Sequence, residues 1–450
     1  MKKTVFALLL LCAMVLAGAE YKLAFSSSKK DAIYNVGEDI LLSAQLLKDG
    51  KAATGCLITY SLHREGQVIS SGKHTVSETP LTVSTKLDKP GWTHIYCKSF
   101  DENGKVLRIK TVFRGKPVVR NLEGGIGAMV EPHKIDISIK EPADFDAFWG
   151  NIKKSVLAHP LKVLEKVDVT PAKQKKNFSV YDVKVSCIGD QPVSGYLVIP
   201  KGGKDAKFPA LVTFHGAGFR SSAMQFGYAG KGLIAFDVNA HGVPNGQAPA
   251  FYQNYRTQLN KKLGGRYNHS GKEDRDKYFY KNVYMRVIRA LQYVKSLPEW
   301  DGKNLFIVGG SQGGAQAIVA CALDHDVTMA RALVPALCDH SGNLTGRQSG
   351  WPRVYSGVNG KPESEKALQT MAYYDNVFFA RRIKCPLYTC TGFIDKVCSP
   401  TSVYAFYNNL PENIVKSMTI TPTAPHTAGE KYFSNALDKY LKKIKKENKR

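Results

Sequence analysis

A serine flanked by glycines is the best candidate nucleophile in this chain. Ser311 lies in the G-x-S-x-G pattern Gly309–Gly313, between the apolar run Leu305–Val308 and the helix-like run Ala315–Leu323. A serine placed between a strand and a helix in this way sits on a sharp turn that exposes its hydroxyl. The pattern therefore predicts a nucleophile elbow, although the pentapeptide alone also occurs in ordinary glycine–serine loops.

A serine hydroxyl needs a general base and an acid that orients this base. In hydrolases built on this elbow, the chain order is Ser, then Asp or Glu, then His. Of the eleven histidines, only His426 follows Asp395, which comes directly after the strand-like run Leu387–Thr391. We predict Ser311, Asp395 and His426 as a catalytic triad. Asp339, after the preceding expected strand, is the alternative acid.

Acyl transfer also needs N–H donors for the oxyanion of the tetrahedral intermediate. The backbone N–H of Gln312, next to the candidate nucleophile, is one expected donor. The second is expected from the loop His215–Gly218, which matches the H-G-x-G type and offers the N–H of Ala217. We expect the His215 side chain to order this loop rather than to react.

These residues must be positioned by a core in which strands alternate with helices. Such alternation from Asp144 onward predicts an α/β fold with a mostly parallel sheet and helices on both faces. Ligands then bind beyond the carboxyl ends of the strands. The expected strands are near Val180–Ser186, Gly195–Ile199, Ala210–Phe214, Leu233–Val238, Leu305–Val308, Ala332–Leu337, Leu387–Thr391 and Met418–Thr421.

The N-terminal region has a different pattern, with short β-rich runs separated by turn residues. This pattern predicts an all-β, immunoglobulin-like sandwich at residues 20–115, then a connector at residues 116–140 and the α/β domain at residues 141–445. Trp92 is expected to pack in the sandwich rather than to form a sugar platform. The expected strands are near Ile40–Leu47, Leu57–Leu62, Leu81–Leu87 and Thr93–Phe100.

Residues 1–19 are typical of a secretory signal peptide. Two lysines precede the apolar run Val5–Leu16, and Ala17–Ala19 offers the small residues of a cleavage site before Glu20. We therefore expect an exported protein, periplasmic or secreted. No membrane span is expected, because no segment reaches the required ~20 apolar residues.

Charge and cysteine content exclude further classes. The net charge is +25, but the basic residues are scattered apart from Lys442–Lys446, so we expect no nucleic-acid partner. The cysteines lack the close pairs of zinc sites, and neither a metal nor another cofactor is expected. Cys56 and Cys97 are a candidate disulfide, with buried free thiols as the alternative.

Together these motifs resemble carbohydrate esterase family 7, the acetyl xylan esterases and cephalosporin C deacetylases of the α/β-hydrolase superfamily. The resemblance implies removal of acetyl groups from sugar hydroxyls through a Ser311 acyl-enzyme, with an acetylated carbohydrate as the partner and no metal. It spans about 142–441 and rests on Asp144–Trp149, His215–Gly216, Tyr278–Tyr284, Gly309–Gly314, Gly392–Pro400 and His426.

One segment departs from that family. Where its members usually carry Arg-Gly-Gln, this chain reads Asn239–Pro244 with His241 in the middle. His241 and Tyr252 are candidate substrate contacts, although each also suits a structural role. The departure leaves a lipase, a peptidase or an esterase for another acyl group as alternatives. A secreted, inactive glycan-binding protein is the alternative from another class. The oligomeric state is left open.

Overall fold

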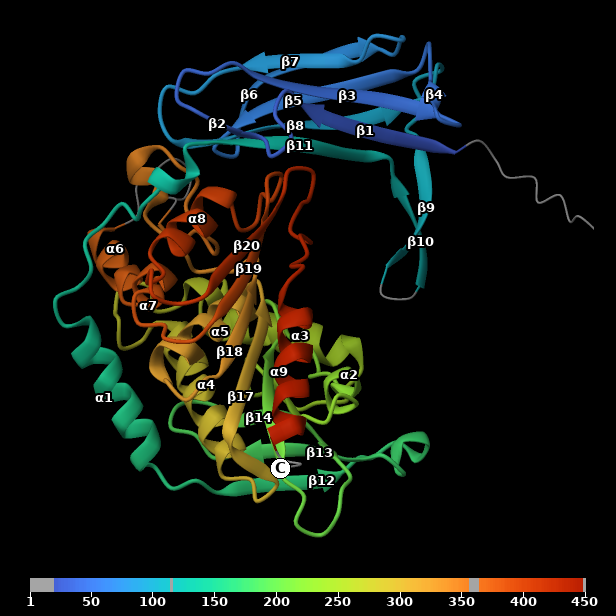
Figure 1. The fold of residues 1–450 in the computed structure, drawn as a ribbon. Coiled ribbons are helices and arrows are strands. Elements are labelled where there is room, and N and C mark those ends of the chain that lie inside the picture. Colours follow the sequence, from blue (N-terminus) through green and yellow to red (C-terminus); the bar gives the residue numbers. More distant parts are fainter. Residues whose placement is uncertain (1–19, 114–115, 356–363, 448–450) are drawn as a thin grey trace, which may run out of the picture.

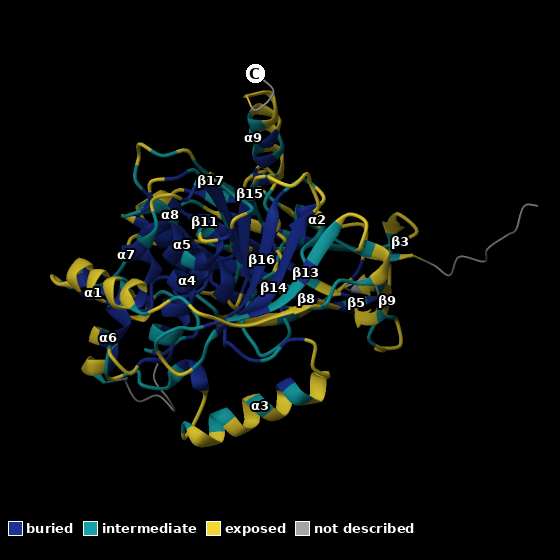
Figure 2. Cartoon of the chain, turned by 90° about the horizontal axis from the view of Figure 1, so that it is seen from below, coloured by how far each residue is buried: buried dark blue, intermediate teal, exposed yellow. Residues whose placement is uncertain are grey.

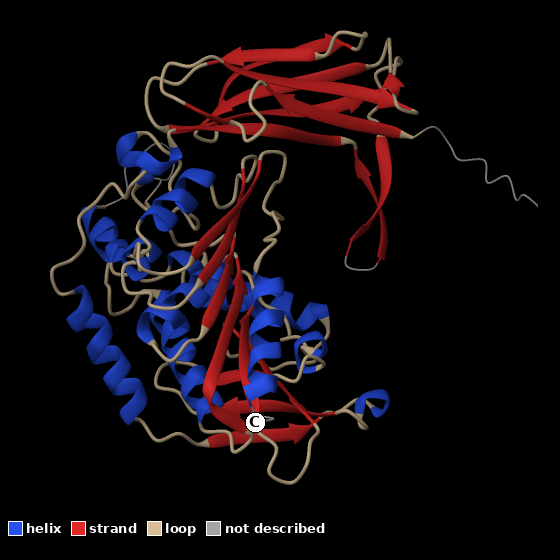
Figure 3. Cartoon of the chain, in the orientation of Figure 1, coloured by secondary structure: helices blue, strands red, loops and turns tan. Residues whose placement is uncertain are grey.

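The described part of the chain divides into a region of strands and a larger region in which strands and helices alternate (Figures 1 and 3). The computed structural model describes residues 20–113, 116–355 and 364–447. The expected signal peptide, residues 1–19, lies outside the described residues. None of the helices in the described ranges combines the length and the apolar composition needed to cross a membrane.

The N-terminal region, residues 20–130 and called the β domain below, contains two facing sheets. Along β3 every second side chain is buried, as expected for a strand with one face on a core. One sheet contains β1 (Tyr21–Ser27), β3 (Ile40–Lys48), β4 (Lys51–Ala52) and β7 (Leu81–Thr85). The other has the order β2 (Ile33–Tyr34), β11 (Glu123–Val130), β8 (Gly91–Phe100), β5 (Leu57–Arg64) and β6 (Gln67–Thr75). A separate hairpin is formed by β9 (Arg108–Phe113) and β10 (Lys116–Asn121).

The structure differs from the expected connector at residues 116–140. Glu123–Val130 forms β11, which pairs with β8 on one side and with β2 on the other. Its glycines suggest a turn in the sequence, yet they lie within the strand, whose backbone packs closely against its neighbours. A glycine-rich run thus forms part of a sheet because side chains would not fit there.

The candidate disulfide between Cys56 and Cys97 is not formed, and both are buried free thiols. On the paired strands β5 and β8, Cys97 lies opposite Tyr60. Cys56 precedes Tyr60 by four positions, which corresponds to about 13 Å along a strand. A disulfide requires Cα atoms within about 7 Å, so the register of these strands excludes the bond.

The larger region is built on a nine-stranded sheet. Its first three strands run antiparallel to their neighbours, and the remaining strands are parallel to one another. The fold is therefore α/β with a mixed sheet. The strand order is β12 (Val163–Asp168), β13 (Phe178–Val185), β14 (Val193–Pro200), β16 (Ile234–Asn239), β15 (Phe208–Phe214), β17 (Trp300–Gly310), β18 (Met329–Leu333), β19 (Leu387–Gly392) and β20 (Lys416–Thr421).

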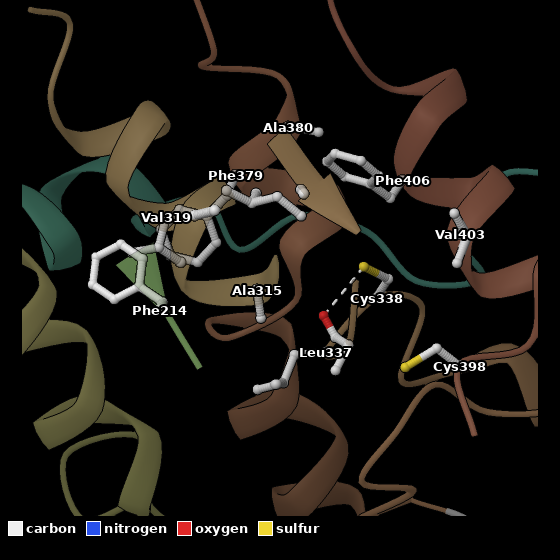
Figure 4. Close-up of a cluster of buried hydrophobic side chains, with 14 of the residues drawn as sticks. Phe214, Ala315, Val319, Leu337, Cys338, Phe379, Ala380, Cys398, Val403 and Phe406 are labelled. Atoms are coloured by element: carbon white, nitrogen blue, oxygen red, sulfur yellow. Dashed lines mark hydrogen bonds between the residues drawn. The ribbon is translucent and has the colours of Figure 1, made fainter. Parts of the chain in front are cut away.

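Helices cover both faces of this sheet, whose central strands are buried (Figure 2). Val212 and Ile307 pack in the cluster that includes α4 and α5, whereas Leu211 and Phe306 pack with α9 on the other face. Figure 4 shows part of the first cluster, where side chains of β15, α5, α7 and α8 gather. The helices are α1 (Phe145–Ala158), α2 (Phe226–Ala229), α3 (Pro249–Lys262), α4 (Phe279–Lys295), α5 (Gln312–Leu323), α6 (Glu365–Ala372), α7 (Asn376–Ala380), α8 (Pro400–Asn408) and α9 (Phe433–Glu447), with short 3₁₀ turns at Pro132–Lys134, Ala172–Gln174, Tyr267–His269 and Gly342–Thr345.

The strand expected at Ala332–Leu337 is shifted toward the N-terminus. β18 ends at Leu333, because Val334 and Leu337 have φ angles of 36° and 54° and turn the chain away from the sheet. The chain then passes under the serine turn, where the N–H of Ala336 donates to the carbonyl of Ser311 at 3.1 Å.

The β domain lies beyond the carboxyl ends of β19 and β20 (Figure 1). This is the edge of the sheet at which α/β proteins bind their ligands. β8 contacts α8 across the boundary between the two regions. The β domain therefore borders the functional edge of the larger sheet.

Candidate active site

Ser311 stands at the top of a tight turn between β17 and α5. Its φ and ψ angles are 58° and −122°, which a residue with a side chain rarely adopts. The glycines around it allow the close approach of strand and helix. A Cβ on Gly309 would lie 1.9 Å from the carbonyl oxygen of Gly313, and a Cβ on Gly313 would lie 2.0 Å from that of Phe214. The turn predicted from the sequence is formed.

The structure brings Ser311, His426 and Asp395 into one hydrogen-bonded chain. The Nε2 atom of His426 is 2.9 Å from the Oγ atom of Ser311, and its Nδ1 atom is 2.7 Å from Oδ2 of Asp395. Ser311, Asp395 and His426 follow β17, β19 and β20, which end at the same edge of the sheet. Because a carboxylate only accepts hydrogen bonds, Nδ1 carries the proton, and Nε2 is free to accept the serine proton.

The Asp395 carboxylate is fixed by its own loop. Its Oδ1 atom accepts the backbone N–H groups of Val397 at 2.8 Å and Cys398 at 3.0 Å, which leaves Oδ2 for His426. The Asp395 side chain is fully buried, whereas 26% of the His426 side chain is exposed. The base is therefore reachable from solvent while the acid behind it is shielded.

Asp339, the alternative acid, makes other contacts. Its Oδ2 atom forms an ion pair with Arg347 at 2.9 Å, and its backbone N–H donates to Asp375. Burial raises the pKa of Asp339, and the nearby Arg347 opposes this effect. Burial, together with the charge of Asp339, also raises the pKa of Asp375 to about 7. Among the described residues, Asp339 makes no hydrogen bond to His426.

The two expected oxyanion donors belong to segments that adjoin Ser311. Gln312 is the first residue of α5, so its N–H belongs to the helix terminus that has no intrahelical acceptor. The loop after β15 also lies close to Ser311, since a Cβ on Gly216 would lie 3.5 Å from Cβ of Ser311. In the described ranges, the N–H groups of Gln312 and Ala217 donate to no other backbone group. Both are available to an oxyanion at Ser311.

His215 orders this loop. Its Nε2 atom accepts the N–H of Ala240 at 3.2 Å, so its Nδ1–H donates to the carbonyl of Gly216 at 2.7 Å. Burial lowers the pKa of His215 to about 4, with a further contribution from Arg220. The ring is therefore neutral at neutral pH and serves as a fixed bridge between the β15 and β16 loops.

The candidate substrate contacts His241 and Tyr252 lie in packed surroundings. The His241 ring stacks on Phe219 with 4.0 Å between ring centres, and burial lowers its pKa well below the ordinary value. The Tyr252 hydroxyl donates to the carbonyl of Pro244 at 2.9 Å and accepts the N–H of Gln247 at 3.2 Å. The structure brings neither side chain into hydrogen-bonding contact with the described residues of the Ser311 chain.

Further residues at the site were given no role from the sequence. Arg353 and Gln348 both donate to the carbonyl of Lys396, next to Asp395. Tyr280 donates to the side chain of Gln312 at 2.9 Å and so holds the start of α5. These contacts join segments that are distant in the chain and have no fixed spacing. Over the described ranges, no cluster of His, Cys, Asp or Glu suited to a metal ion is found.

Comparison with known proteins adds the family context. The family model "Acetyl xylan esterase (AXE1)" matches residues 133–444. An acetyl esterase, Axe7A of Xylanibacter ruminicola, is 37% identical over 311 residues, which cover 68% of this chain and 67% of the relative.

Solved structures show the same fold. The acetyl xylan esterase of Paenibacillus sp. R4 is 26% identical, with a TM-score of 0.55 over 69% of this chain and 98% of its own. Acetyl xylan esterase 1 of Thermoanaerobacterium sp. JW/SL YS485 is 19% identical, with a TM-score of 0.56 over 69% of this chain and 96% of its own. The second likeness supports the fold alone.

Proposed function

Since this chain belongs to the acetyl xylan esterase family, we propose that it is an exported serine esterase that removes acetyl groups from the sugar hydroxyls of xylan. Membership confirms the resemblance noted in the sequence, and the chain is a carboxylic ester hydrolase of α/β-hydrolase fold. The observation that carries the proposed mechanism is the hydrogen-bonded chain of Ser311, His426 and Asp395.

In the first half-reaction, the Ser311 hydroxyl attacks the acetyl carbonyl carbon. Nε2 of His426 takes the serine proton, and Asp395 stabilises the resulting imidazolium. The carbonyl oxygen becomes an oxyanion, for which the N–H groups of Gln312 and Ala217 are the proposed donors. The bond from the carbonyl carbon to the sugar oxygen then breaks. This oxygen takes the proton from His426, and the acetyl group remains on Ser311.

In the second half-reaction, water replaces the sugar. His426 removes a proton from this water while the water oxygen attacks the acetyl carbon of the acyl-enzyme. A second oxyanion forms in the same place and collapses, so that acetate leaves and Ser311 regains its proton from His426. The complete reaction consumes one ester and one water and yields one alcohol and one acid.

The test is hydrolysis of acetylated xylan by the purified protein, followed as released acetate, beside other acetylated sugars and longer-chain esters. Ser311→Ala is expected to lower kcat by roughly a million-fold, because the triad acts as a unit. An unchanged circular dichroism spectrum shows that the variant is folded. Turnover that persists in this variant would contradict the mechanism. Preference for longer acyl chains would favour the alternative esterase or lipase assignment.

We further propose that the β domain is immunoglobulin-like and that the catalytic domain begins near residue 141. Two facing sheets, antiparallel apart from the short β2–β11 pair, support the first proposal. Export is supported by the composition of residues 1–19. Mass spectrometry of the protein from the culture fluid or periplasm tests it, with a mature N-terminus expected at Glu20.

A further inference from the structure

The loop that carries Asp395 is held from outside its own domain. This loop, Phe393–Cys398 and called the acid loop below, is contacted by Trp92 of β8. The indole N–H of Trp92 donates to the carbonyl oxygen of Phe393 at 2.6 Å, and both residues are fully buried. A buried hydrogen bond of this kind fixes the position of the carbonyl, since an unpaired carbonyl there would be unfavourable.

β11 supports the same loop from beside Trp92. A Cβ on Gly127 would lie 2.0 Å from the carbonyl oxygen of Phe393, so only a glycine leaves room for the loop. The backbone N–H of Gly127 also donates to the carbonyl of Pro422 at 2.9 Å. Pro422 lies between β20 and His426. One strand of the β domain therefore contacts the segments that carry both the acid and the base.

The residue that follows Asp395 in the chain also contacts the β domain. The ammonium group of Lys396 lies 4.8 Å from the ring centre of Tyr96, and its Nζ atom is 3.4 Å from Nε2 of His63. The rings of His63, His94 and Trp92 form a continuous stack, with 4.4 Å and 4.5 Å between successive centres. The contacts at Phe393 and at Lys396 thus belong to one continuous surface of the β domain.

A partly buried carboxylate connects this surface to two further segments. Glu65 accepts the backbone N–H of Trp92 at 2.7 Å, the backbone N–H of Gln348 at 3.0 Å and the hydroxyl of Thr401 at 3.2 Å. The side chain of Gln348 in turn donates to the carbonyl of Lys396 at 3.2 Å. Trp92 is therefore itself held in place relative to the catalytic domain.

We propose that Trp92 is a positioning residue, which through the carbonyl of Phe393 keeps the Asp395 carboxylate aligned with His426. The β domain then contributes to catalysis without touching the substrate. This inference rests on the proposed roles of Asp395 and His426. A misplacement of about 1 Å in such a group costs about a hundredfold in rate, so a hydrogen bond two residues away is sufficient to matter.

The experiment compares Trp92→Phe with Thr93→Val in the full-length protein. Phenylalanine keeps an aromatic ring in the stack but removes the indole N–H. Thr93 is the matched control, because its hydroxyl donates to the carbonyl of His63 at 2.8 Å, a buried bond within the β domain that does not involve the acid loop. Both variants are expected to melt at lower temperature. Only Trp92→Phe is expected to lower kcat, by about tenfold or more.

Two readouts separate positioning from general destabilisation. A looser contact with Asp395 stabilises the imidazolium less, so the acid limb of the kcat/KM profile moves to lower pH in Trp92→Phe. The far-downfield proton NMR signal of the Nδ1–H of His426 reports the same contact without any turnover, and it is expected to weaken. It remains informative even if Ser311→Ala stays active and the proposed function fails.

The inference is overturned if Trp92→Phe matches Thr93→Val in kcat, in the acid limb and in the NMR signal. If Trp92→Phe does not fold, the same measurements on Gly127→Ala and Gly124→Ala distinguish positioning from general destabilisation. A Cβ at Gly124 would meet only the ring of Phe25, at 3.2 Å, inside the β domain. A defect confined to Gly127→Ala supports positioning. Equal effects of the two glycine substitutions contradict it.

Discussion

Backbone strain gathers around the candidate nucleophile. Ser311 has a positive φ angle, as do Val334, Leu337 and Asp339 in the segment that passes beneath it. Each such residue costs on the order of 1–3 kcal/mol and persists only where the surroundings determine its conformation. The hydrogen bonds of Ser311 with Leu333 and Ala336 supply such surroundings. The serine is thus presented by a turn whose shape is set by packing on both sides.

The two buried aspartates near the site should respond differently to the loss of charge. Asp395→Asn is expected to lower kcat about ten-thousandfold, because an amide no longer holds His426 in the right tautomer. Asp339→Asn removes one partner of the ion pair with Arg347 and should mainly lower thermal stability. Steady-state kinetics with 4-nitrophenyl acetate and thermal melts of both variants measure the two effects.

The converse outcome would assign to Asp339 the role of the carboxylate that orients His426. A kcat near that of the parent in Asp395→Asn, with a large loss in Asp339→Asn, contradicts the geometry described here. Asp375 lies beside Asp339 and accepts its N–H, so Asp375→Asn is a useful control for damage to that buried cluster. It should reproduce the stability loss without the ten-thousandfold effect on kcat.

Single residues were predictable from the sequence where chain order restricts the choice. His426 is the only histidine after Asp395, so it needed no spatial information. The sequence could not decide between a substrate contact and a structural role for Tyr252 and His241, since burial decides whether a polar ring faces a substrate or a neighbour. The contact of Trp92 with Phe393 joins residues 301 positions apart, and nothing local in the sequence encodes it.

At the scale of elements, α1 contains a glycine that lowers the stability of the helix. Gly150 lies in the middle of this helix, is exposed, and a Cβ there would meet no atom within 4 Å. Alanine loses less backbone entropy on folding, so Gly150→Ala should raise the free energy of unfolding by roughly 0.5–1 kcal/mol. Urea unfolding curves test this.

The activity of Gly150→Ala should equal that of the parent, because α1 contributes no residue to the chain of Ser311, His426 and Asp395. Gly313→Ala provides the contrast. A Cβ there would lie 2.0 Å from the carbonyl oxygen of Phe214, so this substitution should lower both stability and activity. A lower urea midpoint in Gly150→Ala would show that the helix is constrained by a contact other than those described.

Elements with a clear local period were predicted well. The apolar run Leu305–Val308 lies within β17, and Ala315–Leu323 lies within α5. β11 was not predicted, because a glycine-rich strand has the composition of a turn. The end of β18 was placed late, since apolar Val334 and Leu337 continue the strand pattern while their backbone angles leave the sheet. Composition indicates a strand, but its end depends on tertiary contacts.

At the scale of the whole molecule, stability should depend on pH through buried neutral histidines. Burial lowers the pKa of His94 to about 2 and that of His340 to about 3. The unfolded chain binds these protons below about pH 6.5, and the folded protein does not. Stability from these residues is therefore present above about pH 6.5 and is lost as the pH falls.

His94→Phe isolates one of these contributions. At pH 5 the parent should have lost up to about 2 kcal/mol through His94 relative to pH 7.5, and the variant should not show this loss. Chemical unfolding at both pH values measures the difference. Glu65 and Asp375 act in the opposite direction, because burial raises the pKa of each to about 7. Both remain in the variant, so the comparison cancels them.

The exposed His133 provides the control for this experiment. His133→Gln removes a histidine that is accessible to solvent, and it therefore serves as the matched substitution at an exposed position. An unchanged pH dependence in His94→Phe would mean that the stack of His63, His94 and Trp92 opens before the protein unfolds. The β domain would then not be the rigid support that the acid loop requires.

The free thiols have a consequence for how this protein can be made. The eight cysteines of the described residues are unpaired, and all except the half-buried Cys187 are buried. The fold of the described residues therefore depends on no disulfide bond within the chain. A reducing bacterial cytosol is therefore a suitable place for recombinant production. Strong thiol oxidants, by contrast, would reach the buried sulfur atoms mainly in partly unfolded molecules.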